Sequence, residues 1–472
     1  MVFAQSEDDA LRYSFMQPGG TARSVGIGGA FGAVGADPSS ISLNPAGLGL
    51  YTTSEMSITP TLEVNDARST HYGSSSTGTA DRFFINNLAV ILSAPTKPGN
   101  NWRYTTFGLV YDRVASHYWS RVASAEGVKT SLLETFAAEA AGTAAGDLYN
   151  AFPFSAGLAW DAYAIDPLDT VALTYTPAIP FASPVTQQHE ITSQGATKTT
   201  SFFFAANYDD RFFVGASLGI VGLRYDRVTE HRETTEDLAL PFRSFSYRED
   251  LTTRGNGIDL KIGGIAKATE QLRLGLSFHS PLWVNMNDAY RTTLRTSFRN
   301  GDSYEISSPD GSYAYRLRTP WKLVGSASYI FGKSGLVSVD VEWNDHRTAK
   351  LNRSLDIVDS YDFAQENRAI RALGANTVNL RAGTEWRTGN IYYRAGAGYY
   401  PSAYADGDPR SGDALIRFGG GLGYRSERIS VDVALDTGKR TGGYFQYDPS
   451  LVQATTEQLT ATRGMLTFAY RP

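Results

Sequence analysis

Cysteine is absent from this sequence of 472 residues, and histidine occurs only six times. Without cysteine the chain can form neither a disulfide nor a thiolate metal site, and it has no thiol nucleophile. The net charge of −5, from 43 basic and 48 acidic residues, gives no indication of a nucleic-acid partner. No stretch approaches the ~18 to 20 consecutive apolar residues that a membrane-spanning helix requires. A helical membrane protein is therefore excluded, whereas a β-barrel stays open because its strands are apolar only at every second position.

Glycine and aromatic residues are plentiful. The chain has 46 Gly, 27 Tyr, 24 Phe and 7 Trp. Tyrosine-rich aromatics are typical of the membrane interfaces of a β-barrel, and abundant glycine allows close packing of strands. A soluble β-sandwich array shares this composition, so composition alone does not decide between the two.

The stretch 19–50, GGTARSVGIGGAFGAVGADPSSISLNPAGLGL, consists mostly of small residues. Arg23 and Asp37 are its only charged residues, and Pro38 and Pro45 interrupt any regular ladder because proline lacks an amide hydrogen. An exposed, independently folded domain requires more large apolar residues than this. The stretch is either a plug that fits inside another structure or a Gly/Ala linker with a turn at its Asn-Pro step.

The order of this small-residue run and its ending, Asn44-Pro45-Ala46-Gly47, resembles the N-terminal hatch of the FadL/TodX family, outer-membrane transporters for long-chain fatty acids and aromatic hydrocarbons. The resemblance implies a hatch that plugs an all-β, antiparallel transmembrane barrel of about fourteen strands in the outer membrane of a Gram-negative bacterium. It implies as partners a hydrophobic small molecule or fatty acid and outer-membrane lipid. It implies no cofactor and no enzymatic activity.

The expected domains follow from the same resemblance. Residues 6–50 form the hatch and residues 51–472 the barrel, with an extracellular insertion at about 116–189. Residues 1–5, MVFAQ, are expected to be a signal-peptide remnant or a disordered N-terminus. Within the insertion, the sequence of 131–148, SLLETFAAEAAGTAAGDL, predicts a helix.

Period-two alternation recurs throughout the chain after the hatch. In 376–387, for example, Val378 and Leu380 lie on one face and Arg381 and Glu385 on the other. Short turns are expected at 209–210, 267–270, 332–335, 388–389 and 426–427. Long polar connections are expected near 229–246, 298–313, 347–375, 401–412 and 438–460. This alternation of short and long connections is typical of an outer-membrane barrel and is not expected of a sandwich.

Fourteen strands are predicted from this pattern. They are expected at 54–64, 82–93, 104–115, 190–208, 211–228, 247–267, 271–298, 313–331, 334–346, 376–388, 390–400, 413–426, 428–438 and 461–471. Segments 152–163 and 169–178 offer a further hairpin, which would raise the number to sixteen.

Motifs for catalysis or metal binding are weak. The Gly-x-Ser-x-Gly spelling at 215–219 lacks the turn into a helix that a nucleophile elbow needs, because the strand continues beyond it. The histidines have no metal-ligand spacing, and only His117 and His189, in or beside the insertion, keep a metal site as a minor alternative. No metal ligand is therefore assigned.

Three arginines alternate with glycines on the face assigned to the lumen: Arg381, Arg394 and Arg417. They belong either to a mutually paired, solvated charge lining or to a contact for a carboxylate headgroup. In the insertion, the candidate ligand-contacting residues are the apolar Phe152, Phe154, Leu158 and Trp160.

The resemblance implies passive uptake of hydrophobic compounds, with rearrangement of the hatch and lateral exit through a kink in the third strand. That strand is expected at 104–115, and Gly108 is its candidate kink point, since glycine weakens a strand. The alternative is a non-transporting barrel that serves as a partner-binding subunit of an envelope secretion or surface-assembly complex. No catalytic constellation supports a third possibility, a barrel enzyme.

Overall fold

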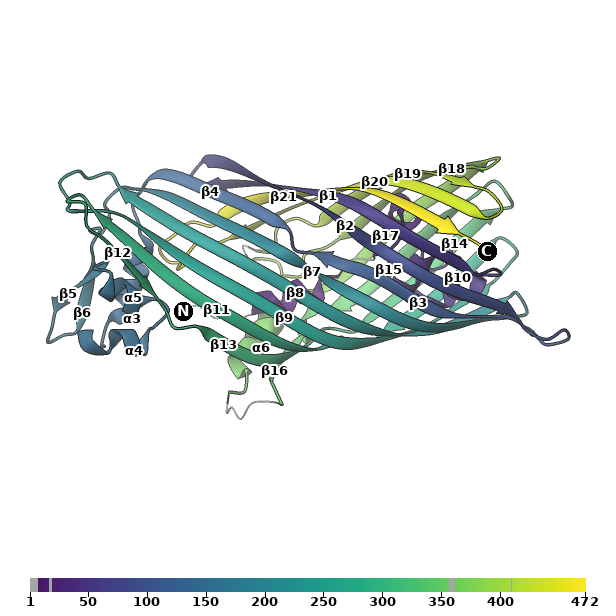
Figure 1. Ribbon diagram of the computed structural model, residues 1–472, viewed down its shortest axis with the longest axis horizontal. Helices are drawn as coiled ribbons and strands as arrows, with labels where there is room; N and C mark the ends of the chain where they lie inside the picture. The colour runs from purple at the N-terminus through teal and green to yellow at the C-terminus, as the bar shows by residue number, and fades with distance from the viewer. Residues whose placement is uncertain (1–6, 17–18, 356–360, 409) are drawn as a thin grey trace.

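The computed structural model describes residues 7–16, 19–355, 361–408 and 410–472 (Figure 1). The expected leader remnant at 1–5 and the first residue of the expected hatch lie outside these ranges. No helix in the described residues is long and apolar enough to cross a membrane.

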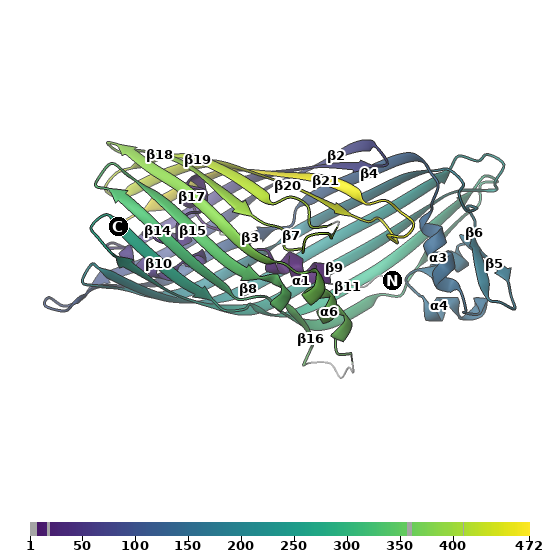
Figure 2. The ribbon, with the colours of Figure 1, turned by 180° about the vertical axis from the view of Figure 1, so that it is seen from behind.

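The described residues form a closed barrel of fourteen antiparallel strand paths (Figures 1 and 2). β1 (Glu55–His71) pairs with both β2 (Ser74–Pro95) and β21 (Thr455–Tyr470), which closes the sheet on itself. Between β2 and β21 the wall consists, in order, of β3 (Trp102–Ser116) continued by β4 (Trp119–Val128), β7 (Val185–Tyr208), β8 (Phe212–Thr235), β9 (Phe242–Lys267), β10 (Leu272–His279) continued by β11 (Trp283–Phe298), β14 (Lys322–Phe331) continued by β13 (Gly311–Arg318), β15 (Gly335–Asp345) with β16 (Lys350–Arg353), β17 (Asn376–Thr388), β18 (Ile391–Tyr400), β19 (Leu415–Arg425) and β20 (Ile429–Tyr444). A short strand, β12 (Ser303–Ser307), forms a hairpin with β11. The prediction of an all-β barrel with about fourteen strands is confirmed.

The two segments that would have raised the number of strands to sixteen lie outside the barrel wall. Segment 152–163 contains the helix α5 (Ala156–Asp161), and 169–178 falls within a separate two-stranded sheet. That sheet pairs β5 (Ile165–Asp169) with β6 (Thr174–Pro177).

An apolar belt surrounds the barrel near the end where short turns join the strands. On β8, Phe212, Val214 and Ile220 face outward and are 53%, 44% and 52% exposed, and Arg224 is the next outward charge along the strand. The residues between them point into the barrel, because successive side chains of a strand alternate between faces. A band of this kind matches the hydrocarbon core of a bilayer.

Several strands continue beyond this belt, further than the alternation predicted. The connection expected at 229–246 is reduced to 236–241, and the one expected at 438–460 to 445–454. β4 and the first residues of β7 likewise lie within the range 116–189 expected as an insertion. The extensions were missed because their outward residues are polar, so their two faces differ little in hydropathy.

The N-terminal segment fills the barrel from the short-turn end. Its short helices are α2 (Ala22–Gly26), η1 (Pro38–Ser42) and η2 (Pro45–Leu50), and almost all of their side chains are buried. Side chains of Thr21, Asp37 and Asn44 accept hydrogen bonds from amides at the start of these three helices. The helix α1 (Glu7–Ser14) lies further along the lumen, beside α6 (Ala364–Leu373) (Figure 2).

The helix predicted at 131–148 is shorter than expected. α3 (Leu132–Ala140) begins with a capping box between Ser131 and Glu134, and Gly142 follows its end at positive φ. Two further short elements, η3 (Ala145–Asp147) and α4 (Leu148–Ala151), precede α5. With β5 and β6 these helices form a small lobe at the other end of the barrel (Figure 1).

Candidate functional site

Glycines on the inner wall allow the N-terminal plug, residues 19–50, to approach the strand backbone. A Cβ on Gly263 of β9 would lie 2.0 Å from Oδ1 of Asn44, and one on Gly383 of β17 would lie 2.0 Å from the carbonyl oxygen of Ile27. A side chain at Gly383 would collide with the plug backbone, and one at Gly263 would displace the side chain of Asn44. The wall and the plug are therefore matched in shape at the level of single atoms.

The Asn-Pro-Ala motif is one anchor of the plug. Asn44 accepts a hydrogen bond from the amide of Ala46 (3.1 Å) and donates its own amide hydrogen to the carbonyl oxygen of Gly264 (3.1 Å). Pro45 occupies the first turn of η2, and Ala46 is buried against Phe213. The motif predicted from sequence thus joins the plug to β9, while Gly47 packs against η1 within the plug.

Buried ion pairs form the second anchor. Arg23 of the plug donates two hydrogen bonds of 2.9 Å to the carboxylate of Glu385, which also accepts one from Arg394. The amides of Phe31 and Gly32 donate to the carboxylate of Asp340. The wall charges therefore hold the plug as well as each other.

The three candidate lumen cations have protein partners in the structure. Arg381 contacts Glu342 at 2.9 Å, Arg394 contacts Asp432 at 2.7 Å, and Arg417 contacts Asp436 at 2.8 Å. The three arginines are paired with wall carboxylates, as in a mutually paired lining, but Arg381 and Arg394 are buried and not solvated. A headgroup contact would require at least one of these pairs to open.

We expect Glu385→Gln to lower the free energy of unfolding by about 3–5 kcal/mol, because it leaves the buried Arg23 with an uncompensated charge. Unfolding in urea, followed by tryptophan fluorescence, measures this loss. Arg103→Gln is the matched control: it breaks an exposed 3.0 Å pair with Asp209, which contributes about 0–1 kcal/mol. Equal losses in the two variants would contradict a special role for the buried pair.

The lumen beyond the plug is apolar and contains α1. Inward side chains such as Leu223, Leu251 and Met286 form one cluster with Ala10 and Tyr13 of α1. At the polar side of α1, Asp8 accepts hydrogen bonds from Tyr404 (2.6 Å) and Arg410 (2.7 Å) of the connection between β18 and β19. A hydrogen bond from the same Arg410 holds the pKa of Asp408 below its usual range.

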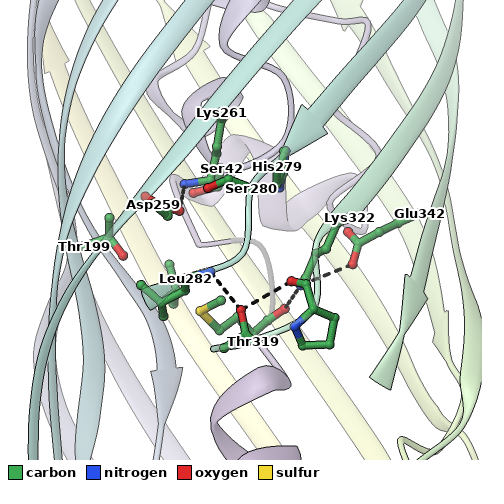
Figure 3. Close-up of a pocket in the computed structure, with 13 residues that line it drawn as sticks. Ser42, Thr199, Asp259, Lys261, His279, Ser280, Leu282, Thr319, Lys322 and Glu342 are labelled. Atoms are coloured by element: carbon green, nitrogen blue, oxygen red, sulfur yellow. Dashed lines mark hydrogen bonds and ion pairs between the residues drawn. The ribbon is translucent and has the colours of Figure 1, made fainter. Parts of the chain in front are cut away.

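A small polar cavity separates the end of α1 from the plug (Figure 3). Its volume is about 50 Å³, and Lys261 and Lys322 point into it beside His279. Each lysine has a carboxylate neighbour: Asp259 lies 2.6 Å from Lys261, and Glu342 lies 3.5 Å from Lys322. The two lysines therefore lie between the apolar lumen around α1 and the plug.

The barrel wall has a gap in its backbone pairing between β2 and the third strand path, which consists of β3 and β4. We call this gap the window. The ladder between β2 and β3 extends from Pro95 and Tyr104 to Asn87 and Asp112, and stops there. Beyond it, the described part of β2 pairs only with β1, and β4 only with β7. β2 and β4 approach each other again at Gly78, where a Cβ would lie 2.3 Å from the carbonyl oxygen of Ser120, and further on the hydroxyls of Ser76 and Ser124 lie 3.0 Å apart. Between the end of the β2–β3 ladder and Gly78, β2 has no backbone ladder with the third strand path.

A cavity of about 400 Å³ lies at this window, lined by Phe84, Ile85, Leu88, Tyr111, Arg113 and Lys198. The guanidinium of Arg113 sits 4.0 Å from the ring centroid of Phe84 and so closes part of the window. The plug begins directly behind it: Asn86 donates a 2.7 Å hydrogen bond to the carbonyl oxygen of Gly20, and Ser42 donates one of 2.8 Å to Asp112. The edge of the plug therefore lies next to the window.

Gly108, the candidate kink point, lies within the β2–β3 ladder below the window. It pairs with Ile91 and Phe203 without a change of register, and a Cβ there would lie 2.1 Å from the carbonyl oxygen of Val90. The register of the strand changes further along, at Arg113, next to the window. A role for Gly108 in lateral exit stays a prediction.

Three of the four candidate ligand contacts in the insertion meet in one cluster, and Phe154 packs separately against β11. Leu158 is fully buried, and Phe152 and Trp160 pack against the same core. The ring of Phe154 lies 5.0 Å from that of Tyr290. These four residues belong to the lobe, and their contact with a ligand stays a prediction.

Sequence reasoning missed the residues at the window. Phe84, Ile85 and Tyr111 were assigned to ordinary strands, because the absence of a ladder between two strands leaves no mark in either strand alone. One signal was present: Asn86 and Asn87 are consecutive, and both are buried, so they interrupt the alternation at the point where the ladder ends.

Comparisons with known proteins agree with this architecture. No protein-family model and no curated protein sequence matches the chain. Among solved structures, a FadL homologue of Pseudomonas aeruginosa is 14% identical over 97% of this chain and 99% of its own, with a TM-score of 0.58. The toluene transporter TodX of P. putida is 11% identical over 96% and 99%, with a TM-score of 0.55. The toluene transporter TbuX of Ralstonia pickettii is 15% identical over 96% and 98%, with a TM-score of 0.52. The resemblance seen in the hatch motif is thus confirmed at the level of the fold: the chain is a plugged barrel like those of the FadL and TodX channels.

Proposed function

We propose that the chain is an outer-membrane channel for passive uptake of hydrophobic compounds, such as long-chain fatty acids. The observation that carries this proposal is the window between β2 and the third strand path, which lies next to a plugged lumen. A hydrophobic molecule gains little from an axial exit into water, whereas a lateral opening leads it into the apolar part of the bilayer. The solved structures named as toluene transporters support a substrate of this class.

The proposed path has three parts. An oily molecule enters the apolar lumen around α1, and a carboxylate on it meets Lys261 and Lys322 in the polar cavity. The plug then rearranges near Gly20 and Ser42, which lie behind the window. The molecule leaves sideways through the window, beyond the end of the β2–β3 ladder. The short turns face the periplasm and the lobe faces the outside, as in outer-membrane barrels generally.

A second candidate function is that of a partner-binding subunit in an envelope secretion or surface-assembly complex. One observation favours it: the lobe exposes large apolar side chains, with Leu168 70%, Val171 92% and Phe181 60% exposed. Exposed apolar patches mark interaction sites on many proteins. Capture of oily molecules from outside would use the same patch, so the two functions need an experimental test.

Gly108→Val should slow the uptake of a hydrophobic compound more than it weakens binding of that compound. The added side chain clashes with the carbonyl of Val90 and disturbs the ladder that borders the window, while the lumen contacts stay unchanged. Uptake into cells and equilibrium binding to the purified protein are compared for the variant. Gly222→Val, on the outward face of β8 where a Cβ meets nothing within 4 Å, is the control for general effects of valine on folding. Equal losses of uptake and binding would point to misfolding instead.

Native mass spectrometry of the protein, gently extracted from its own membrane, separates the two functions. A channel should appear as a chain that carries a substoichiometric fatty acid or similar oily molecule, which lipid analysis then identifies. A stoichiometric protein companion together with an empty barrel would favour the subunit.

A further inference from the structure

A cluster of three cations lies on the outer surface of the barrel, at the edge of the apolar belt. Arg316 and Arg318 of β13 and Lys350 of β16 point outward, away from the lumen. Arg318 and Lys350 are directly opposite each other in the ladder. Like charges in that position are unfavourable unless an anion lies between them.

The described residues supply no such anion. None of their carboxylates forms an ion pair with these three cations. Arg316 donates instead to the carbonyl oxygen of Arg353 at 3.1 Å, and Arg318 to that of Thr348 at 3.4 Å. Neutral carbonyl groups leave the combined positive charge uncompensated.

The outward neighbours of the cluster are neutral amides. Asn285 of β11 is opposite Arg316 on one side, and Asn352 of β16 is opposite it on the other. An amide side chain donates two hydrogen bonds, so these residues add donors and no negative charge. The patch is therefore suited to an anion with several oxygen atoms, such as a phosphate, which arginine binds with two parallel hydrogen bonds.

Aromatic rings lie directly below the cations. Trp283 is opposite Arg318 in the ladder and is 48% exposed. The ring of Trp321 lies 4.6 Å from that of Trp343 and 5.7 Å from that of Phe278. Tryptophan at this position is typical of the membrane interface, where lipid headgroups meet the hydrocarbon. The surface thus offers a cationic patch at headgroup level and an apolar surface beneath it.

We propose that this cluster binds the phosphate groups of a phosphorylated membrane lipid, whose acyl chains lie against Trp283, Trp321 and Phe278. With the orientation proposed above, the lipid belongs to the outer leaflet and is a phosphorylated glycolipid of the lipid A type. The site is on the outside of the wall, apart from the lumen and the window, so it is independent of whether the barrel transports anything. A bound phosphate would also stabilise the short β16 strand by relieving the repulsion between Arg318 and Lys350.

The opposite wall provides a matched control. There Lys439 of β20 and Arg68 of β1 are also exposed outward cations, but they face Thr460 and Gln458 in the ladder. They carry the same total charge without the cross-strand pair of cations. The test compares Arg318→Gln/Lys350→Gln with Arg68→Gln/Lys439→Gln, both in the full chain.

Each purified protein is titrated in neutral detergent with bisphosphorylated lipid A, and the bound fraction is measured by native mass spectrometry. Migration on unheated gels verifies that each barrel is folded. We expect affinity to fall roughly twenty-five-fold in the first variant, since each of the two cations near the membrane surface contributes about a fivefold factor. Affinity in the control variant should equal that of the natural protein. Dephosphorylated lipid A should bind the natural protein and both variants equally weakly. Equal losses in both variants, or no loss in the first, would overturn the proposal.

Discussion

Oxidation of an Ala33→Cys/Gly275→Cys variant is expected to stop the uptake of a hydrophobic compound, and reduction should restore it. Ala33 belongs to the plug and Gly275 to β10 of the wall. A Cβ on Gly275 would lie 3.4 Å from the Cβ of Ala33, close to the ~3.5–4.5 Å span of a disulfide. The natural sequence has no cysteine, so this bond would be the only disulfide in the protein. It would fix the plug to the wall and prevent the rearrangement that opens the path to the window.

The reversible bond separates locking of the plug from damage to it. A side chain at Gly275 also approaches the carbonyl oxygen of Gly32 at 2.9 Å, so the reduced variant itself is expected to be slower than the natural protein. The two single-cysteine variants serve as controls, because oxidation should leave their uptake unchanged. If the double variant is fully cross-linked by mass spectrometry and still takes up the compound at its reduced rate, the plug does not need to move.

Deletion of residues 19–48 is expected to make the barrel leak small hydrophilic solutes. These residues fill the lumen between the inner walls, and the wall glycines that receive them have no side chains to take their place. The barrel itself should still fold, because every strand of its ladder lies after residue 54. Influx of a hydrophilic antibiotic measures the leak, and altered migration on unheated gels verifies that the barrel is intact.

A deletion elsewhere controls for general disturbance of the membrane. β5 and β6, residues 165–177, pair only with each other and lie in the lobe at the opposite end. Their removal should cause no leak. Unchanged permeability after deletion of 19–48 would show that this segment is not the barrier in the lumen.

The sequence predicts much of the barrel because a single physical rule applies along it. Wherever one face of a strand meets lipid and the other meets the plug, apolar and polar side chains alternate strictly, as in the pair Leu380 and Arg381. Beyond the belt the outward face meets no hydrocarbon and its residues are polar, so the alternation has no long apolar face to reveal it. This is why the ends of β8, β9 and β20 were assigned to loops.

The plug was recognisable by its small residues and its Asn-Pro-Ala motif, but its contacts were not. Arg23 and Glu385 are 362 positions apart, and nothing near either residue indicates the other. Occupation of the apolar lumen by α1 also depends on distant strands, since Tyr13 packs beside Tyr225. The window likewise arises from the relation between two strands, and each strand alone has an ordinary sequence.

Uptake of a labelled hydrophobic compound into cells that lack their own channels of this kind measures directly whether the barrel transports such compounds. Cells that produce this chain are compared with cells that produce the oxidised Ala33→Cys/Gly275→Cys variant at the same level in the membrane. We expect rapid uptake with the natural protein and background uptake with the locked one. Background uptake with both proteins, each folded and present in the membrane, would contradict a channel for hydrophobic compounds.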